Sequence, residues 1–262
     1  MKFFITLTII LFNTYIFAQN TPNGLVLYGH KQSLGMGAPI GIDYNATLTF
    51  SNNKSSYVCK KDSLEGGHVN EHITSRSGNT ITLSQKITNE KGFIYFYDKN
   101  KNISKSRDIG FMYVKEPIPK INWKISSESK KIGDFVCSKA TAHFRGRDYT
   151  AWFTTVIPLP FGPWKLQGLP GLILEAYDTN KEVYFYFKSV KYPYNGEAFI
   201  EDPDPTSENK KWITFDDFKL ATIKAYNRGV ENFRLVTEQN SDNIIESKKP
   251  LMKNAYLEVF DH

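Results

Sequence analysis

Short runs of alternating apolar and polar residues, separated by Gly, Asn and Asp, fill most of the chain. Alternation with a period of two between such breaks is typical of β-strands joined by hairpins. This pattern predicts a mainly β protein built on an antiparallel sheet. The expected strands cover residues 24–34, 45–51, 55–60, 80–87, 93–98, 102–116, 122–126, 133–145, 149–155, 172–178 and 182–192.

One stretch, residues 215–234, has a helical pattern instead. Phe218, Ala221 and Ala225 recur at the spacing of one helix face, and Thr214 is a suitable N-cap. We expect this helix to pack against a highly curved sheet or half-open barrel. The polar stretches 61–79, 127–131 and 201–210 are expected to be a loop, a turn and a second loop.

The first eighteen residues have the parts of a secretory signal peptide. Lys2 precedes an apolar run from Phe3 to about Ile10, and Ala18 stands at the predicted exit before Gln19. An uncleaved N-terminal anchor is the alternative. We expect residues 1–18 to be removed and residues 19–262 to form a single domain in the periplasm or outside the cell. The net charge of +6 comes from scattered basic pairs, which argues against nucleic acid as a partner.

An apolar, proline-rich segment joins the expected strands at 149–155 and 172–178. Proline fixes φ and offers no N–H, so this segment cannot be a central strand or a helix. Its large apolar side chains predict that it packs down across an edge or an open end of the sheet. The prolines are Pro158, Pro160, Pro163 and Pro170, and the apolar residues are Ile157, Leu159, Phe161, Trp164, Leu166 and Leu169.

The same segment ends in a specific string, GLPGLI, which comprises Gly168, Leu169, Pro170, Gly171, Leu172 and Ile173. FGPWK (161–165) and RGRDYTAWF (145–153) precede it. The chain therefore resembles the GLPGLI family of exported bacterial envelope proteins, most densely over residues 132–178. That family has no assigned biochemical activity, so the resemblance implies a compartment and an architecture. The pattern is more loosely similar to the half-open barrel of lipoprotein-carrier (LolA-like) proteins, a likeness of fold that does not establish function.

Aromatic residues make up 15% of the chain, and most should belong to the core. Residues 184–187, however, present aromatic rings to both faces of one expected strand. If one face is core, the other is either a second buried face or an apolar groove, which is a common ligand site. The sequence thus favours a non-catalytic envelope protein that binds a lipid-like apolar ligand or an outer-membrane partner. The expected binding residues are Trp152, Phe161, Trp164, Leu169, Tyr184 and Tyr186.

Three other patterns leave alternatives open. Cys59 and Cys137 are either a disulfide, which an oxidising compartment favours, or two separate buried thiols. His143 with Asp148 could serve acid–base chemistry in a secreted hydrolase, although neither GxSxG nor HExxH occurs. His68 and His72 have the spacing of two metal ligands on a helix, but Gly66-Gly67 disfavours one there and no third ligand is evident. No catalytic residue, cofactor or metal is therefore expected.

Overall fold

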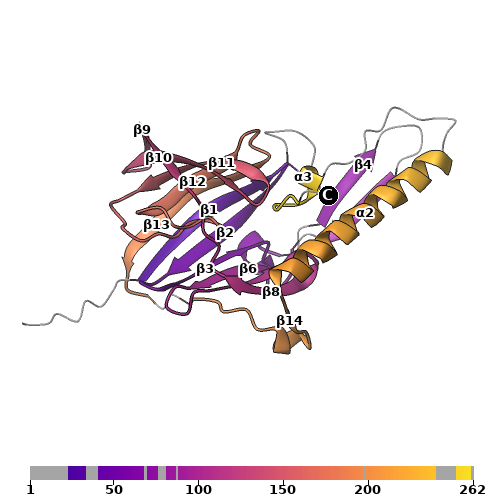
Figure 1. Ribbon diagram of the computed structural model, residues 1–262, viewed down its shortest axis with the longest axis horizontal. Coiled ribbons are helices and arrows are strands. Elements are labelled where there is room, and N and C mark those ends of the chain that lie inside the picture. Colours follow the sequence, from indigo (N-terminus) through magenta and orange to yellow (C-terminus); the bar gives the residue numbers. More distant parts are fainter. Residues whose placement is uncertain are drawn as a thin grey trace, which may run out of the picture.

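The computed structural model describes residues 23–33, 41–67, 70–75, 81–86, 88–196, 199–239 and 252–260. Most of this part of the chain is β-structure (Figure 1), as predicted. The predicted signal peptide, residues 1–18, lies outside the described residues. The helices are α1 (Asp62–Glu65), α2 (Phe215–Gln239) and α3 (Met252–Ala255). The strands are β1 (Asn23–Gln32), β2 (Ile42–Phe50), β3 (Lys54–Cys59), β4 (Asn70–Ser75), β5 (Ile81–Lys86), β6 (Phe93–Asp98), β7 (Ile103–Asp108), β8 (Met112–Pro117), β9 (Lys124–Ile132), β10 (Phe135–Phe144), β11 (Arg147–Thr154), β12 (Leu172–Asp178), β13 (Val183–Tyr194) and β14 (Trp212–Ile213).

Twelve of these strands form one sheet in the order β14-β8-β7-β6-β3-β2-β1-β13-β12-β11-β10-β9. All neighbours are antiparallel except the short parallel pair β14 and β8. Strand β1 joins the two halves of the sheet, because it pairs with β2 on one side and β13 on the other. The two end strands do not pair with each other, so the sheet is open. β4 and β5 form a separate hairpin.

The sheet bends strongly around a single side chain, Trp164. Its indole lies 6.4 Å from the Tyr95 ring on β6 and 5.8 Å from the Phe144 ring on β10. These strands are seven positions apart in the sheet order. A flat sheet would separate them by roughly 33 Å. Both rings can meet one indole only because the sheet curves, which confirms the predicted curved, half-open form. We call the face that holds Trp164 the inner face and the opposite face the outer face.

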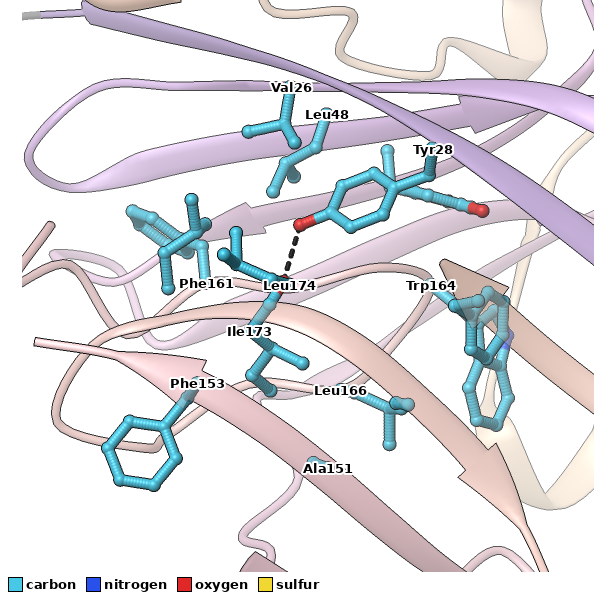
Figure 2. Close-up of a cluster of buried hydrophobic side chains, with 14 of the residues drawn as sticks. Val26, Tyr28, Leu48, Ala151, Phe153, Phe161, Trp164, Leu166, Ile173 and Leu174 are labelled. Carbon is cyan, nitrogen blue, oxygen red and sulfur yellow. Dashed lines mark hydrogen bonds between the residues drawn. The ribbon is translucent and has the colours of Figure 1, made fainter. Parts of the chain in front are cut away.

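The proline-rich crossover, residues 155–171, lies on this inner face. We expected it at an edge or an open end; instead the curved sheet wraps around it, and residues 161–166 are all buried. Tyr97 donates a hydrogen bond to the Lys165 carbonyl at 3.0 Å. Tyr28 donates to the Ile173 carbonyl at 2.5 Å (Figure 2). The Tyr97 phenol of β6 thus satisfies a backbone carbonyl that the irregular crossover would otherwise leave unpaired in the core, and the Tyr28 phenol of β1 binds the start of β12, where the crossover ends.

Two stretches that we expected to be irregular are strands. Residues 127–131 belong to β9, and the turn comes later, at Gly133 with φ +55°. β9 is an end strand whose residues are mostly exposed, so polar side chains are tolerated there and apolar alternation is lost. The expected loop at 61–79 contains α1 and β4. The expected helix is confirmed as α2, with Asp217 donating its backbone N–H to the Thr214 hydroxyl at 3.1 Å.

The two glycines of the GLPGLI string, Gly168 and Gly171, differ in whether they tolerate a side chain. A Cβ on Gly171 would lie 2.1 Å from the Thr154 carbonyl oxygen, whereas Gly168 has open space around it and a φ of +95°. We therefore expect Gly171→Ala to lower the free energy of unfolding by about 2–3 kcal/mol through overpacking. Gly168→Ala should cost only about 1 kcal/mol of backbone strain. Urea unfolding followed by circular dichroism measures both, and equal losses would contradict the difference.

Candidate functional site

The inner face around Trp164 is filled by the chain itself. Phe161, Trp164 and Leu169 are each 2% exposed or less. The Trp164 ring stacks on Phe185 of β13 at 6.4 Å and lies 6.1 Å from Tyr149 of β11. Our expectation that these three residues form a ligand surface is therefore wrong. The crossover gains more by burying its own large side chains here, at about 1.5–3 kcal/mol each, than by leaving a groove.

The outer face carries a row of tyrosines. Tyr184 and Tyr186 of β13 point away from Phe185, since neighbouring residues of a strand face opposite sides. Tyr177 of β12 pairs directly with Tyr184, so it shares the outer face. The ring centroids lie 5.9 Å apart for Tyr177 and Tyr184 and 5.4 Å apart for Tyr184 and Tyr186. We call Tyr177, Tyr184 and Tyr186, all half-buried, the tyrosine stripe.

Trp152 extends this face, although it is nearly covered. It pairs with Glu175 across β11 and β12 and is 8% exposed. The Lys130 ammonium lies 4.4 Å from the Trp152 ring and 2.6 Å from a Glu175 oxygen, so it lies over the indole. Of the six expected binding residues, Trp152, Tyr184 and Tyr186 thus lie on the outer face. Sequence reasoning missed Tyr177 because a bulge in β12 shifts the strand's register before it.

Lysines border the tyrosine stripe. Lys181 lies 5.0 Å from the Tyr177 ring, and Lys188 lies 5.5 Å from the Tyr186 ring. Tyr186 donates a hydrogen bond to Asp43 at 2.7 Å. Burial, helped by that hydrogen bond, raises the pKa of Tyr186 to about 12. Burial and the charge of Glu175 do the same for the pKa of Tyr184. Both phenols therefore stay neutral, and the face offers flat rings, hydroxyls and ammonium groups.

A buried charge cluster lies at one end of the inner face. The crossover places Lys165 there with its side chain 1% exposed. Its ammonium lies 2.5 Å from Glu258 and 3.3 Å from Asp108, and Tyr95 donates to Asp108 at 3.1 Å. Burial alone would lower the pKa of Lys165, but the two carboxylates outweigh it and leave that pKa raised. Burial, with the Asp108 charge, holds the pKa of Glu258 above its usual range despite Lys165.

A small cavity of about 30 Å³ adjoins this cluster. Gln32, Tyr95, Asp108, Phe218 and Glu258 are among the residues that line it. Gln32 Oε1 and Glu258 Oε2 are buried without a hydrogen-bond partner, which fits a site for one bound water. Ligand pockets are usually about 300–1,000 Å³, so this cavity is far too small for a lipid.

The two cysteines are free, buried thiols. Cys59 lies on β3 and Cys137 on β10, and five strands of the sheet stand between them. Of the two alternatives that the sequence left open, the structure therefore has the two separate thiols and not the disulfide. Burial raises the pKa of Cys59 to about 12 and that of Cys137 to about 11, which makes both thiols poor nucleophiles.

The histidine pair of the hydrolase alternative lies in solvent. His143 Nδ1 and Asp148 Oδ1 are 2.8 Å apart across the β10–β11 hairpin, and their side chains are 68% and 74% exposed. General acid–base catalysis needs the pair to face a bound substrate, usually in a cleft that excludes water. The geometry of this exposed pair therefore gives the hydrolase alternative no support.

The metal alternative rests on residues that are only partly described. His68 lies outside the described residues, and His72 lies on strand β4, where the helical spacing does not apply. Within the described ranges, no three His, Cys, Asp or Glu side chains gather as metal ligands would. Within the same ranges, no helix combines the length and the apolar character that crossing a bilayer requires.

Comparison with known proteins finds one family model that matches a short central segment of the chain. The model of a family described as "Protein of unknown function (Porph_ging)" matches residues 145–175. The match begins at the β10–β11 turn and includes Arg147, Trp152, Lys165 and the GLPGLI string. It is consistent with the resemblance drawn from the sequence, although it carries a different name. No curated protein matches the chain.

Among solved structures, the chain is similar to PNGF-II in two crystal forms. The form in space group C2 has a TM-score of 0.46 at 13% identity, over 74% of this chain and 31% of that one. The form in P21 has a TM-score of 0.47 at 14% identity, over 76% and 32%. The chain thus spans about a third of the length of PNGF-II.

Proposed function

We propose that the chain is a non-catalytic protein of the bacterial envelope that binds an acidic protein partner through the tyrosine stripe. One observation carries the proposal: Tyr177, Tyr184 and Tyr186 form a continuous, half-buried row with ammonium groups beside its rings. Tyrosine is enriched at protein interfaces, where its ring supplies contact area and its hydroxyl supplies hydrogen bonds. The predicted signal peptide supports export.

Two features favour a protein partner over an apolar ligand. The inner face around Trp164, which a carrier of lipids would keep open, is packed with the crossover. The tyrosine stripe lies on the outer face of the curved sheet and is bordered by Lys181 and Lys188, so it suits a protein surface rather than a small molecule. Lysines at the rim attract a partner with exposed carboxylates and speed its association, an effect that salt screens.

The test is site-specific photo-crosslinking in the native host, with the crosslinker at Lys188 beside the stripe. We expect the mature chain, beginning at Gln19, to form one adduct in the periplasmic fraction with an acidic protein. The double variant Tyr184→Ser/Tyr186→Ser should reduce the adduct at least tenfold, because it removes the central rings. Raised salt should weaken binding of the purified pair.

The matched control is Leu220→Gln, which alters a side chain 65% exposed on α2 and keeps a good helix former. It should leave the adduct unchanged. An adduct that survives the tyrosine double variant would contradict the proposed surface. Recovery of the whole chain from the cytoplasm with Met1 intact would contradict the proposed location.

A further inference from the structure

The C-terminal segment, residues 252–260, is held by side chains that lie about a hundred residues earlier. Arg147, at the start of β11, is 5% exposed. Its guanidinium donates to the carbonyls of Leu257 at 2.9 Å and Tyr256 at 2.8 Å, and also to that of Lys253. Asp178 holds the same guanidinium in place at 2.6 Å. One arginine, held in place by Asp178, therefore donates hydrogen bonds to three backbone carbonyls of the segment.

The turn before Arg147 is also shaped to receive the segment. Val259 donates its backbone N–H to the Arg145 carbonyl at 2.9 Å. Gly146, with φ +76°, lies so close that a Cβ there would stand 2.1 Å from the Val259 carbonyl oxygen. Only glycine permits this approach. The turn residues Arg145 and Gly146 thus contact both the amide N–H and the carbonyl oxygen of Val259.

Two side chains of the segment enter prepared sites. The Glu258 carboxylate meets the buried Lys165 ammonium at 2.5 Å. Two residues later, Phe260 packs against the rings of Phe215 and Phe218 in the first turn of α2, at 5.9 Å and 6.3 Å. A backbone, a carboxylate and an aromatic ring are therefore recognised together, and this combination is the chemistry of a peptide.

We propose that Arg145, Gly146, Arg147, Lys165, Phe215 and Phe218 form a peptide-binding cradle, which the chain's own C-terminal segment fills in cis. Its ligand in trans is a short peptide segment of another polypeptide with a carboxylate two residues before an aromatic ring. Charge complementarity supports this ligand, because the carboxylate of the bound segment lies nearer to the buried Lys165 ammonium, at 2.5 Å for Glu258, than Asp108 of β7 does at 3.3 Å. The cradle is separate from the tyrosine stripe, so this inference goes beyond the proposed function.

The experiment uses the full chain and a fluorescent peptide of the sequence MKNAYLEVF, blocked at both ends. The cis segment competes at high effective concentration, so the wild type should bind the peptide weakly. The full-length variant Glu258→Gln/Phe260→Ala loosens the cis segment and leaves the cradle intact. We expect fluorescence anisotropy to show at least tenfold tighter binding to this variant than to the wild type.

Three controls define the cradle. Adding Lys165→Met to that variant should weaken peptide binding at least tenfold, and so should Gln in place of Glu258 within the peptide. Tyr184→Ser/Tyr186→Ser should leave peptide binding unchanged, which separates this result from failure of the proposed function. Near-ultraviolet circular dichroism checks that each variant is folded. If Glu258→Gln/Phe260→Ala is not folded, Phe260→Ala alone takes its place.

Hydrogen exchange of the wild type gives a second readout that needs no substitution. We expect the Val259 amide to exchange through a local opening, with a lower free energy than the amides of β1. Peptide binding that is absent from the loosened variant, or indifferent to Lys165→Met, would overturn the proposal. Exchange of Val259 only through global unfolding would overturn it as well.

Discussion

Replacing Trp164 with alanine should lower the free energy of unfolding by about 3–5 kcal/mol, the usual cost of truncating a buried tryptophan. The indole is 1% exposed and meets rings from β6, β10, β11 and β13. Its loss would leave a cavity at the centre of the curved sheet, where strands from both halves converge. Urea unfolding followed by far-ultraviolet circular dichroism measures the loss.

Trp212→Ala is the matched control for this prediction. Trp212 is half-buried on the two-residue end strand β14, where its ring meets Tyr113 at 5.8 Å. Because water can fill the space that this truncation leaves, the loss should be markedly smaller than at Trp164. Equal losses at the two tryptophans would mean that Trp164 does not organise the core.

Replacing Lys165 with methionine should cost about 3–5 kcal/mol at neutral pH, because it removes the ammonium that pairs with two buried carboxylates, and Arg145, 3.9 Å from Glu258, replaces it only in part. Methionine nearly matches the length of the lysine chain, so the charge is what changes. The pKa of Glu258, which burial already raises, would then rise further, because the Lys165 charge that lowers it is gone. Since such a group destabilises the fold only when it is ionised, the loss should shrink as the pH is lowered.

Two further variants test the cause of that loss. Adding Glu258→Gln to Lys165→Met removes one unpaired carboxylate and should recover part of the stability. Lys105→Met breaks a more exposed pair, in which Lys105 lies 2.8 Å from Asp202, and should change stability by no more than about 1 kcal/mol. Urea midpoints at matched slopes provide the comparison. A Lys165 variant no worse than the Lys105 variant would show that the buried pair contributes nothing.

Much of the fold was predictable because its signals are local. Alternation identified most strands, and the spacing of Phe218, Ala221 and Ala225 identified α2. The apolar side chains of the crossover showed that it must be buried, although not where. Residues 184–187 indicated rings on both faces, and the structure places Phe185 inside with Tyr184 and Tyr186 outside.

The remaining features depend on contacts between residues far apart in the sequence. Nothing near Lys165 in the chain shows that Glu258, 93 residues later, reaches it. Arg147 likewise gives no local sign that it binds the C-terminal segment. The sequence around Cys59 and Cys137 likewise does not show whether the two thiols are paired or separate. The polar strand β9 carries no apolar alternation to detect.

The pairing of β1 with β13 at the centre of the sheet links the order of synthesis to the order of assembly. Of these two strands β1 is synthesised first, but its partner β13 ends at Tyr194. His30 therefore cannot pair with Phe185 until β13 has been made. Non-local pairing of this kind makes folding slow, because the entropy of closing a long loop is lost before any contact is gained. In a nascent chain the pairing of β1 with β13 therefore stays open until residue 194 has been made, which would keep the sheet incomplete for the export that we propose.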